Sequence, residues 1–152
     1  MYRRILVPLD GSTTANRGLD EAIRLAKSHR GTLILLHVAD ESVLTQNIEA
    51  GAAMIEGLLE SLREGGRKIL EKAEAKARRH RVRARSVLVE NMLGGVADVI
   101  VRQARKTRAQ LIVIGTHGRR GVARVVLGSA AEGVVRTSNV PVLLIRASDK
   151  RR

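Results

Sequence analysis

The chain contains no cysteine, and Tyr2 is its only Phe, Trp or Tyr residue. The absence of cysteine excludes disulfides and thiolate metal sites. Proteins that bind single-stranded nucleic acid usually stack bases on aromatic rings, and this chain lacks the rings for such a platform. The first apolar run stops at Pro8 without a signal-peptide cleavage site, and no run approaches the about 20 residues of a membrane span. We therefore expect a cytoplasmic protein without a membrane partner.

Acidic residues are too few to balance the basic ones, and the formal net charge is +13. A surface this basic attracts polyanions, although a general preference for arginine codons explains the excess equally well. The densest group, Arg78 to Arg85, crosses an expected helix end and an expected strand, where charges also protect a sheet edge. No helix-turn-helix or zinc-finger spacing appears. We predict no specific nucleic-acid site, only weak, sequence-blind binding that fades with salt.

Hydrophobic periodicity predicts strands that alternate with helices. Continuous apolar runs are typical of strands buried on both faces, and apolar residues repeating at three and four mark helices. The expected strands are 5–7, 32–38, 82–89, 111–114 and 140–145. The expected helices are 14–28, 52–79, 96–106 and 130–137. This order predicts an α/β fold with a parallel sheet covered by helices on both faces.

The expected domain spans residues 1–147, and we expect the basic tail 148–152 to be disordered. Gly31 is expected to end the first helix, and Gly65-Gly66 to interrupt and bend the second, because glycine is a poor helix former. Leu58 and Leu62 belong to the expected buried stripe of that second helix. In an open parallel sheet, ligands bind beyond the carboxyl ends of the strands, which directs attention to the loops there.

A glycine-rich stretch, Gly115 to Gly121, follows the fourth expected strand, and Gly128-Ser129 opens the last helix. Glycine lets a backbone approach an anion closely, and a helix N-terminus offers unpaired N–H groups to phosphate. Ser129 and Glu132 also have the spacing of a capping box, so Ser129 is interpreted as an N-cap, a phosphate ligand or both. The common P-loop and the dinucleotide fingerprint are both missing. The stretch therefore indicates a phosphate site of another type.

The pattern Gly115-x2-Gly118-x9-Gly128-Ser129 resembles the nucleotide-binding signature of the universal stress proteins. The resemblance extends over essentially the whole chain, through Ile5 to Ser12, Leu36-His37-Val38 and Val140 to Leu144. It implies a three-layer α/β/α sandwich whose five-stranded sheet has the order 3-2-1-4-5. It also implies ATP in the ATP-binding branch, which keeps these glycines. One departure lies at Glu90 to Gly95, where the proline usual in the family is missing.

The resemblance implies a set of ATP contacts by matching position. Pro8, Leu9 and Asp10 would lie on the ribose or base side, and the backbone of Val38 would meet the adenine. The residues expected around the phosphates are Gly115, His117 and Gly118 on one side and Gly128, Ser129 and Ala130 on the other. We expect ATP to bind with Mg²⁺, while the histidines show no metal-ligand spacing that would indicate a protein metal site.

No nucleophile with a neighbouring base is evident, so no catalytic residue is assigned. We predict a nucleotide-dependent module for stress response or signalling, with a slow ATPase as the alternative. The apolar strand 140–145 would lie at a sheet edge, and an uncovered apolar edge tends to pair with another chain. Both this pattern and the resemblance predict a homodimer through the last strand.

Overall fold

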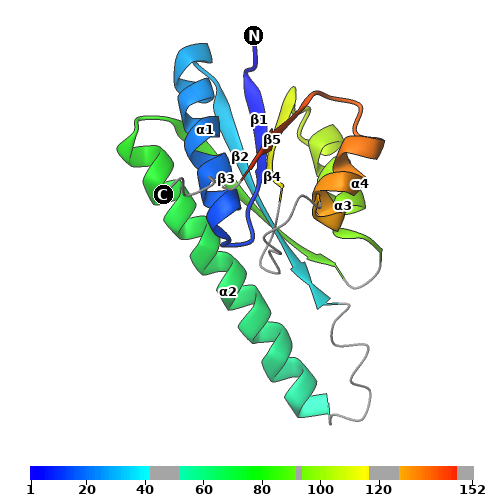
Figure 1. The fold of residues 1–152 in the computed structure, drawn as a ribbon. Helices are drawn as coiled ribbons and strands as arrows, with labels where there is room; N and C mark the ends of the chain where they lie inside the picture. Colours follow the sequence, from blue (N-terminus) through cyan, green and yellow to red (C-terminus); the bar gives the residue numbers. More distant parts are fainter. Residues whose placement is uncertain (42–51, 92–93, 117–126, 147–152) are drawn as a thin grey trace, which may run out of the picture.

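The protein is a five-stranded parallel sheet with two helices on each face (Figure 1). The structure is a computed structural model, and it describes residues 1–41, 52–91, 94–116 and 127–146. The strands are β1 (Arg4–Pro8), β2 (Thr32–Asp40), β3 (Arg83–Asn91), β4 (Leu111–Gly115) and β5 (Val142–Ile145). The helices are α1 (Thr13–His29), α2 (Ala52–Arg79), α3 (Val96–Lys106) and α4 (Ser129–Thr137). The predicted elements are all confirmed, with ends that differ by at most two residues.

The strand order is β3-β2-β1-β4-β5, and every pair is parallel, as the resemblance implies. Helices α1 and α2 cover one face, and α3 and α4 cover the other (Figure 1). Alternate residues of each central strand therefore enter two separate apolar layers. Ile5 and Val7 pack toward α1 and α2, whereas Leu6 packs toward α3 and α4. This double burial explains why the central strands are continuous apolar runs.

Helix α2 continues through Gly65 and Gly66, so the expected interruption at this pair is wrong. A Cβ atom at Gly66 would lie 2.5 Å from the His37 ring and 2.8 Å from Leu88, whereas Gly65 has nothing within 4 Å. Gly66 therefore lets the helix approach the sheet closely. The expected burial of Leu58 is also wrong, because this side chain is 44% exposed. Figure 1 shows the reason: the first half of α2 extends past the end of the sheet.

Helices α1, α2 and α3 end in the same turn, with an arginine in the left-handed conformation after each. These residues are Arg30 (φ 51°), Arg81 (φ 59°) and Arg108 (φ 52°). The next backbone N–H donates to the carbonyl five residues earlier in each turn, at 2.8, 3.0 and 2.9 Å respectively. Glycine or asparagine is the usual residue at such a position. Arginine at all three is therefore unusual.

Gly31 has a different role from the one expected, because Arg30 takes the left-handed position that ends α1. A Cβ atom at Gly31 would lie 2.8 Å from the carbonyl oxygen of Tyr2, on the segment leading into β1. Glycine is thus required by the contact between two neighbouring strand starts. The two outer strands are β3, whose Arg83 and Arg85 are exposed, and β5. The exposed arginines on β3 fit the interpretation of edge protection.

Candidate nucleotide site

The carboxyl ends of β1 and β4 lie side by side, because these strands are neighbours in the sheet. Pro8 ends β1, Leu9 is buried behind it, and Asp10 is half-buried in the turn that leads to α1. An Asp10 carboxylate oxygen accepts a hydrogen bond from the Ser12 backbone N–H at 2.9 Å. Gly11 takes a left-handed φ of 82° in the same turn. The predicted residues 8–10 therefore lie at the strand end where a ligand is expected.

Helix α1 begins directly over the end of β4. Ser12 is its N-cap, and the Ser12 hydroxyl accepts from the Ala15 N–H at 3.2 Å. A Cβ atom at Gly115 would lie 2.9 Å from the Thr14 carbonyl carbon and 3.0 Å from the Ala15 nitrogen. Gly115 is therefore needed for the packing of α1 on β4, whatever it contacts in a ligand. The contact of Gly115 with buried Thr14 joins residues far apart in the chain, and no pattern in the sequence predicts it.

The start of α4 is bonded to the exit of β4. The buried residue Thr116 donates its N–H to the Ile145 carbonyl at 2.8 Å, and its own carbonyl accepts from the Gly128 N–H at 2.7 Å. The residues between them include His117 and Gly118, which lie outside the described residues. The Thr116–Gly128 bond thus brings the two halves of the glycine signature to one place.

The N-terminus of α4 is arranged differently from the predicted capping box. Gly128 is the N-cap and has no side-chain cap bond, while the exposed Ser129 is the first helical residue. Ser129 is therefore not the N-cap, and Glu132 pairs with Arg136 at 2.5 Å instead. Ala130 follows, half-buried, in the first turn. No side chain of the described residues caps the first-turn N–H groups, and such groups with the positive end of the helix dipole favour an anion.

Strand β2 continues past Val38 to Asp40, so Val38 is half-buried within the strand, opposite Val89. Its neighbour His37 is buried, and the His37 Nδ1 atom forms a 2.7 Å hydrogen bond with the Leu9 carbonyl. This bond joins β2 to the segment that carries Asp10. In the sequence, His37 was part of the Leu36-His37-Val38 run of the resemblance and had no metal-ligand spacing, and this hydrogen bond was not expected. The available signal was a polar residue inside an apolar run.

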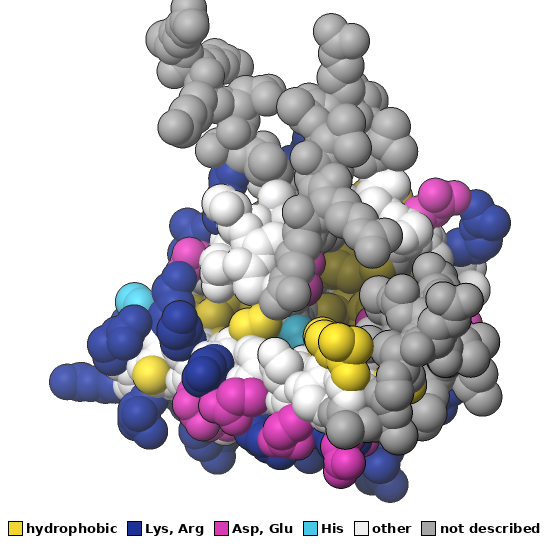
Figure 2. Space-filling view, turned by 90° about the horizontal axis from the view of Figure 1, so that it is seen from below, with side chains coloured by type: hydrophobic (Ala, Val, Ile, Leu, Met, Phe, Trp, Pro, Cys, Tyr) yellow, Lys and Arg dark blue, Asp and Glu magenta, His cyan; other side chains and the backbone are white. Residues whose placement is uncertain are grey.

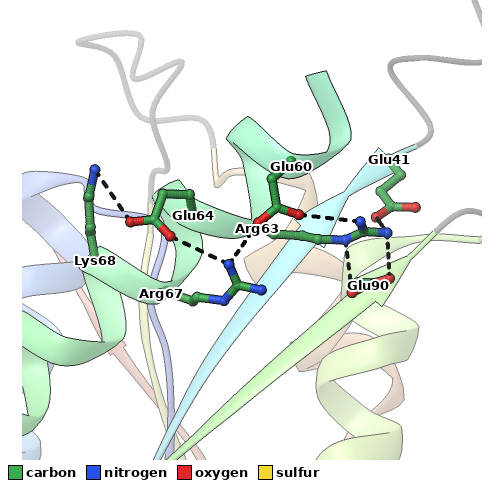
Figure 3. Close-up of polar contacts among 7 residues, drawn as sticks. All are labelled: Glu41, Glu60, Arg63, Glu64, Arg67, Lys68 and Glu90. Carbon is green, nitrogen blue, oxygen red and sulfur yellow. Dashed lines mark hydrogen bonds and ion pairs between the residues drawn. The ribbon is translucent and has the colours of Figure 1, made fainter. Parts of the chain in front are cut away.

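A network of charges joins α2 to the ends of β2 and β3 at the same edge of the sheet (Figure 3). The Arg63 guanidinium contacts Glu90 through two nitrogens, at 3.0 and 3.1 Å. It also lies 3.6 Å from Glu60 and 3.8 Å from Glu41, which is 3% exposed. The hydrogen bond with Glu90 raises the pKa of Arg63 above its ordinary value. The network therefore fixes α2 beside the strand that carries Val38.

Glu60 also accepts a 2.9 Å hydrogen bond from Arg67, two turns further along α2. This bond lowers the pKa of Glu60 below its ordinary value of 4.5. Partial desolvation opposes the shift, and the positive charges of Arg67 and Arg63 reinforce it. Glu60 is thus ionised at neutral pH and holds the two guanidinium groups along one side of the helix (Figure 3).

The carboxyl edge of the sheet is the face seen in Figure 2, where recessed hydrophobic side chains lie near the centre. The structure brings together residues 8–10, Gly115 and residues 128–130 around the ends of β1 and β4, with Val38 on β2 beside them. The described residues include no group of three or more His, Asp or Glu side chains placed to hold a metal ion. None of the described helices combines the length and apolar character needed to cross a bilayer.

Comparison with known proteins agrees with this arrangement. The model of the universal stress protein family matches residues 1–146. The chain belongs to this family. Universal stress protein YxiE of Bacillus subtilis is 33% identical over 151 residues, which cover 96% of this chain and 100% of that relative. The solved structure of MJ0577, a universal stress protein of Methanocaldococcus jannaschii, has a TM-score of 0.87, with 27% identity and 99% of each chain covered.

A third relative was solved with a ligand. It is a universal stress protein in complex with cAMP, with a TM-score of 0.67 and 26% identity, and the match covers 97% of this chain and 98% of that one. The universal stress fold of our chain therefore has at least one relative that holds an adenine nucleotide. The order of the sheet is the one that the family resemblance implied.

Proposed function

We propose that this universal stress protein binds ATP at the carboxyl edge of the sheet and acts as a nucleotide-dependent module in stress response or signalling. The observation that carries the proposal is the Thr116–Gly128 hydrogen bond of 2.7 Å. This bond holds the N-terminus of α4 at the exit of β4, and β4 is the neighbour of β1, which leads to Asp10. Phosphate suits the N–H groups of such a helix end. The cAMP complex of a relative supports an adenine nucleotide as the ligand.

In this proposal the phosphates contact the backbone of Gly128, Ser129 and Ala130, with Gly115, His117 and Gly118 on the other side. Pro8, Leu9 and Asp10 lie on the ribose or base side, and the Val38 backbone meets the adenine. The Asp10 carboxylate would orient a ribose hydroxyl or a water bound to Mg²⁺. The metal enters with the nucleotide.

Isothermal titration with ATP, with and without Mg²⁺, tests the site. Gly128→Val places a branched side chain at the N-cap of α4 and should abolish binding while the fold survives. Gly118→Val should do the same. Gly65→Ala is the control, because a Cβ atom at Gly65 has nothing within 4 Å. Equal ATP affinity in wild type and Gly128→Val would show that the site lies elsewhere.

A slow ATPase is the alternative, and the position of Asp10 at the strand end is the observation that favours it. Phosphoryl transfer also requires a positioned water and charge clamps, and no catalytic residue is assigned here. Turnover at saturating ATP and Mg²⁺ separates the two functions. Steady phosphate release that Asp10→Asn abolishes, with ATP affinity retained, would make the protein an enzyme.

We further propose a cytoplasmic homodimer that forms through β5. This strand is the outer strand beside β4, and its residues are half-buried in the single chain. An apolar edge strand of this kind tends to pair with another chain. Light scattering at micromolar concentration should give the dimer mass. Deletion from Val140 onward should cost both the dimer and stability, because β5 also pairs with β4.

A further inference from the structure

The opposite edge of the sheet carries a concentration of positive charge. Because all five strands are parallel, their starts and the ends of α1, α2 and α3 meet at this amino edge, which is the upper side of Figure 1. Four segments lie there: residues 1–4, 27–31, 76–86 and 105–110. They contain no Asp or Glu. Their basic residues are Arg3, Arg4, Lys27, Arg30, Lys76, Arg78, Arg79, Arg81, Arg83, Arg85, Arg105, Lys106 and Arg108.

This edge accounts for the whole net charge of the protein. Its four segments hold 13 of the 28 Lys and Arg residues, and the 15 that remain equal the 15 Asp and Glu residues of the chain. Lys76 pairs with Asp20 at 2.5 Å. The other twelve are exposed, and no ion pair to another described residue offsets their charge. The excess charge is therefore gathered at one edge and is open to solvent.

At three of these positions the backbone conformation favours a residue other than arginine. This indicates that arginine is present there for its charge and not for the geometry of the helix end. Arg30, Arg81 and Arg108 hold the left-handed positions that favour glycine or asparagine. A cation near a helix C-terminus does complement the helix dipole, but the last turns already contain Lys27, Arg78 and Arg105 for that purpose. Three further arginines in an unfavourable conformation exceed what helix capping requires.

The arginines form a row across the edge. In the strand order β3-β2-β1-β4, Arg81 precedes β3, Arg30 precedes β2, Arg4 begins β1 and Arg108 precedes β4. The Arg4 Nε atom donates to the Arg108 carbonyl at 2.6 Å, which joins the last two members. Neighbouring strands lie about 4.8 Å apart, so the row spans about 14 Å.

We propose that the amino edge binds the phosphate backbone of double-stranded nucleic acid without reading its sequence. A duplex carries one charge per about 1.7 Å of its axis with both strands counted, so a length of about 14 Å holds about eight phosphates, and the row faces those on the near side. A duplex fits better than a single strand, since Tyr2 packs edge-on against His29 and offers no platform for bases. It fits better than a lipid surface, because Met1 is the one exposed large hydrophobic side chain of the described residues at this edge. The edge is opposite the proposed ATP site and does not depend on it.

Fluorescence anisotropy with labelled DNA duplexes of unrelated sequence, at about 50 and about 150 mM salt, tests the proposal on the full chain. The edge variant is Arg30→Gly/Arg81→Gly/Arg108→Gly, which suits the left-handed conformation and should fold normally. The charge-matched control is Arg24→Gln/Lys72→Gln/Arg102→Gln, with one exposed residue from each of the same three helices. Thermal unfolding of both variants checks the fold.

Wild type should bind all duplexes alike, and the edge variant should bind them about a thousandfold more weakly at the lower salt, because three phosphate contacts are lost. On a plot of log affinity against log salt concentration, the slope for the edge variant should be smaller in magnitude by about 3. Each lost phosphate contact reduces the slope by about 0.9. The control should keep the wild-type slope. An equal loss of affinity in the control would show that only net charge matters and would overturn the proposal. Tighter binding to a single strand, or capture by phosphatidylserine vesicles at a salt that releases the duplex, would overturn it too.

Discussion

The two edges of the sheet differ in chemistry although the same strands form both. The carboxyl edge has a tight turn at Gly11, a close backbone contact at Gly115, buried polar side chains such as His37 and Thr116, and the carboxylates Glu41 and Glu90 held by a guanidinium. The four segments of the amino edge contain only basic charges, and all of these except Lys76, which pairs with Asp20, are exposed. A parallel sheet sends every strand start to one edge and every strand end to the other. The alternation of strands and helices can therefore place turns that suit an anion at one edge of the sheet and a cationic surface at the opposite edge.

Gly115→Val should produce the largest effect and disrupt the carboxyl edge alone. The new side chain meets the backbone of Thr14 and Ala15, which cannot rotate away as a side chain would. We expect a loss of about 3 kcal/mol in the free energy of unfolding, together with loss of ATP binding. Urea denaturation and calorimetric titration measure the two effects. Unchanged stability would show that α1 does not pack on β4 as closely as described.

Gly31→Ala should disrupt the amino edge in the same way but leave the nucleotide site intact. Its methyl group would approach the Tyr2 carbonyl oxygen, which belongs to the segment entering β1. We expect a loss of about 2 kcal/mol in the free energy of unfolding, with unchanged ATP affinity below the unfolding temperature. If ATP affinity falls in parallel with stability, the two edges are not independent.

The glycine pair of α2 offers a matched comparison on one helix. Gly65→Ala should raise the free energy of unfolding by about 1 kcal/mol, because alanine is the better helix former and space is open there. Gly66→Ala should lower it by about 1 kcal/mol, since the methyl group would displace His37 and Leu88. Nitrogen shifts of the His37 ring by NMR should move only in Gly66→Ala. Equal stabilisation by both substitutions would contradict the close contact.

The smallest effect concerns pH and Glu60. Because the folded pKa of Glu60 lies below its ordinary value of 4.5, the carboxylate stabilises the fold above that pH. The contribution is lost as the pH falls below 4.5 toward the folded pKa. Glu60→Gln should therefore lower the unfolding temperature slightly at neutral pH and match wild type in strong acid. A difference that persists at the acid end would indicate a packing effect in place of a charge effect.

Much of the fold was predictable from periodicity and chain order. The helices 52–79 and 96–106 have the expected bounds, because each repeats apolar residues over several turns. The location of the candidate site in the fold was predictable, because the ends of β1 and β4 must be neighbours once the strand order is known. His117 and Gly118 lie outside the described residues, so their roles stay predictions. The capping role of Ser129 was wrong because a three-residue spacing fits two registers of a helix start.

The sequence by itself determined the alternation of strands and helices, the two apolar layers and the excess of arginine, since these depend on residue type and spacing along the chain. Only the tertiary structure decided which glycines are required. Gly31, Gly66 and Gly115 each face atoms distant in sequence or on another element, and no local pattern reports such contacts. It also decided that the excess charge gathers at one edge. That edge assembles from four separate segments, and only the parallel sheet brings them together.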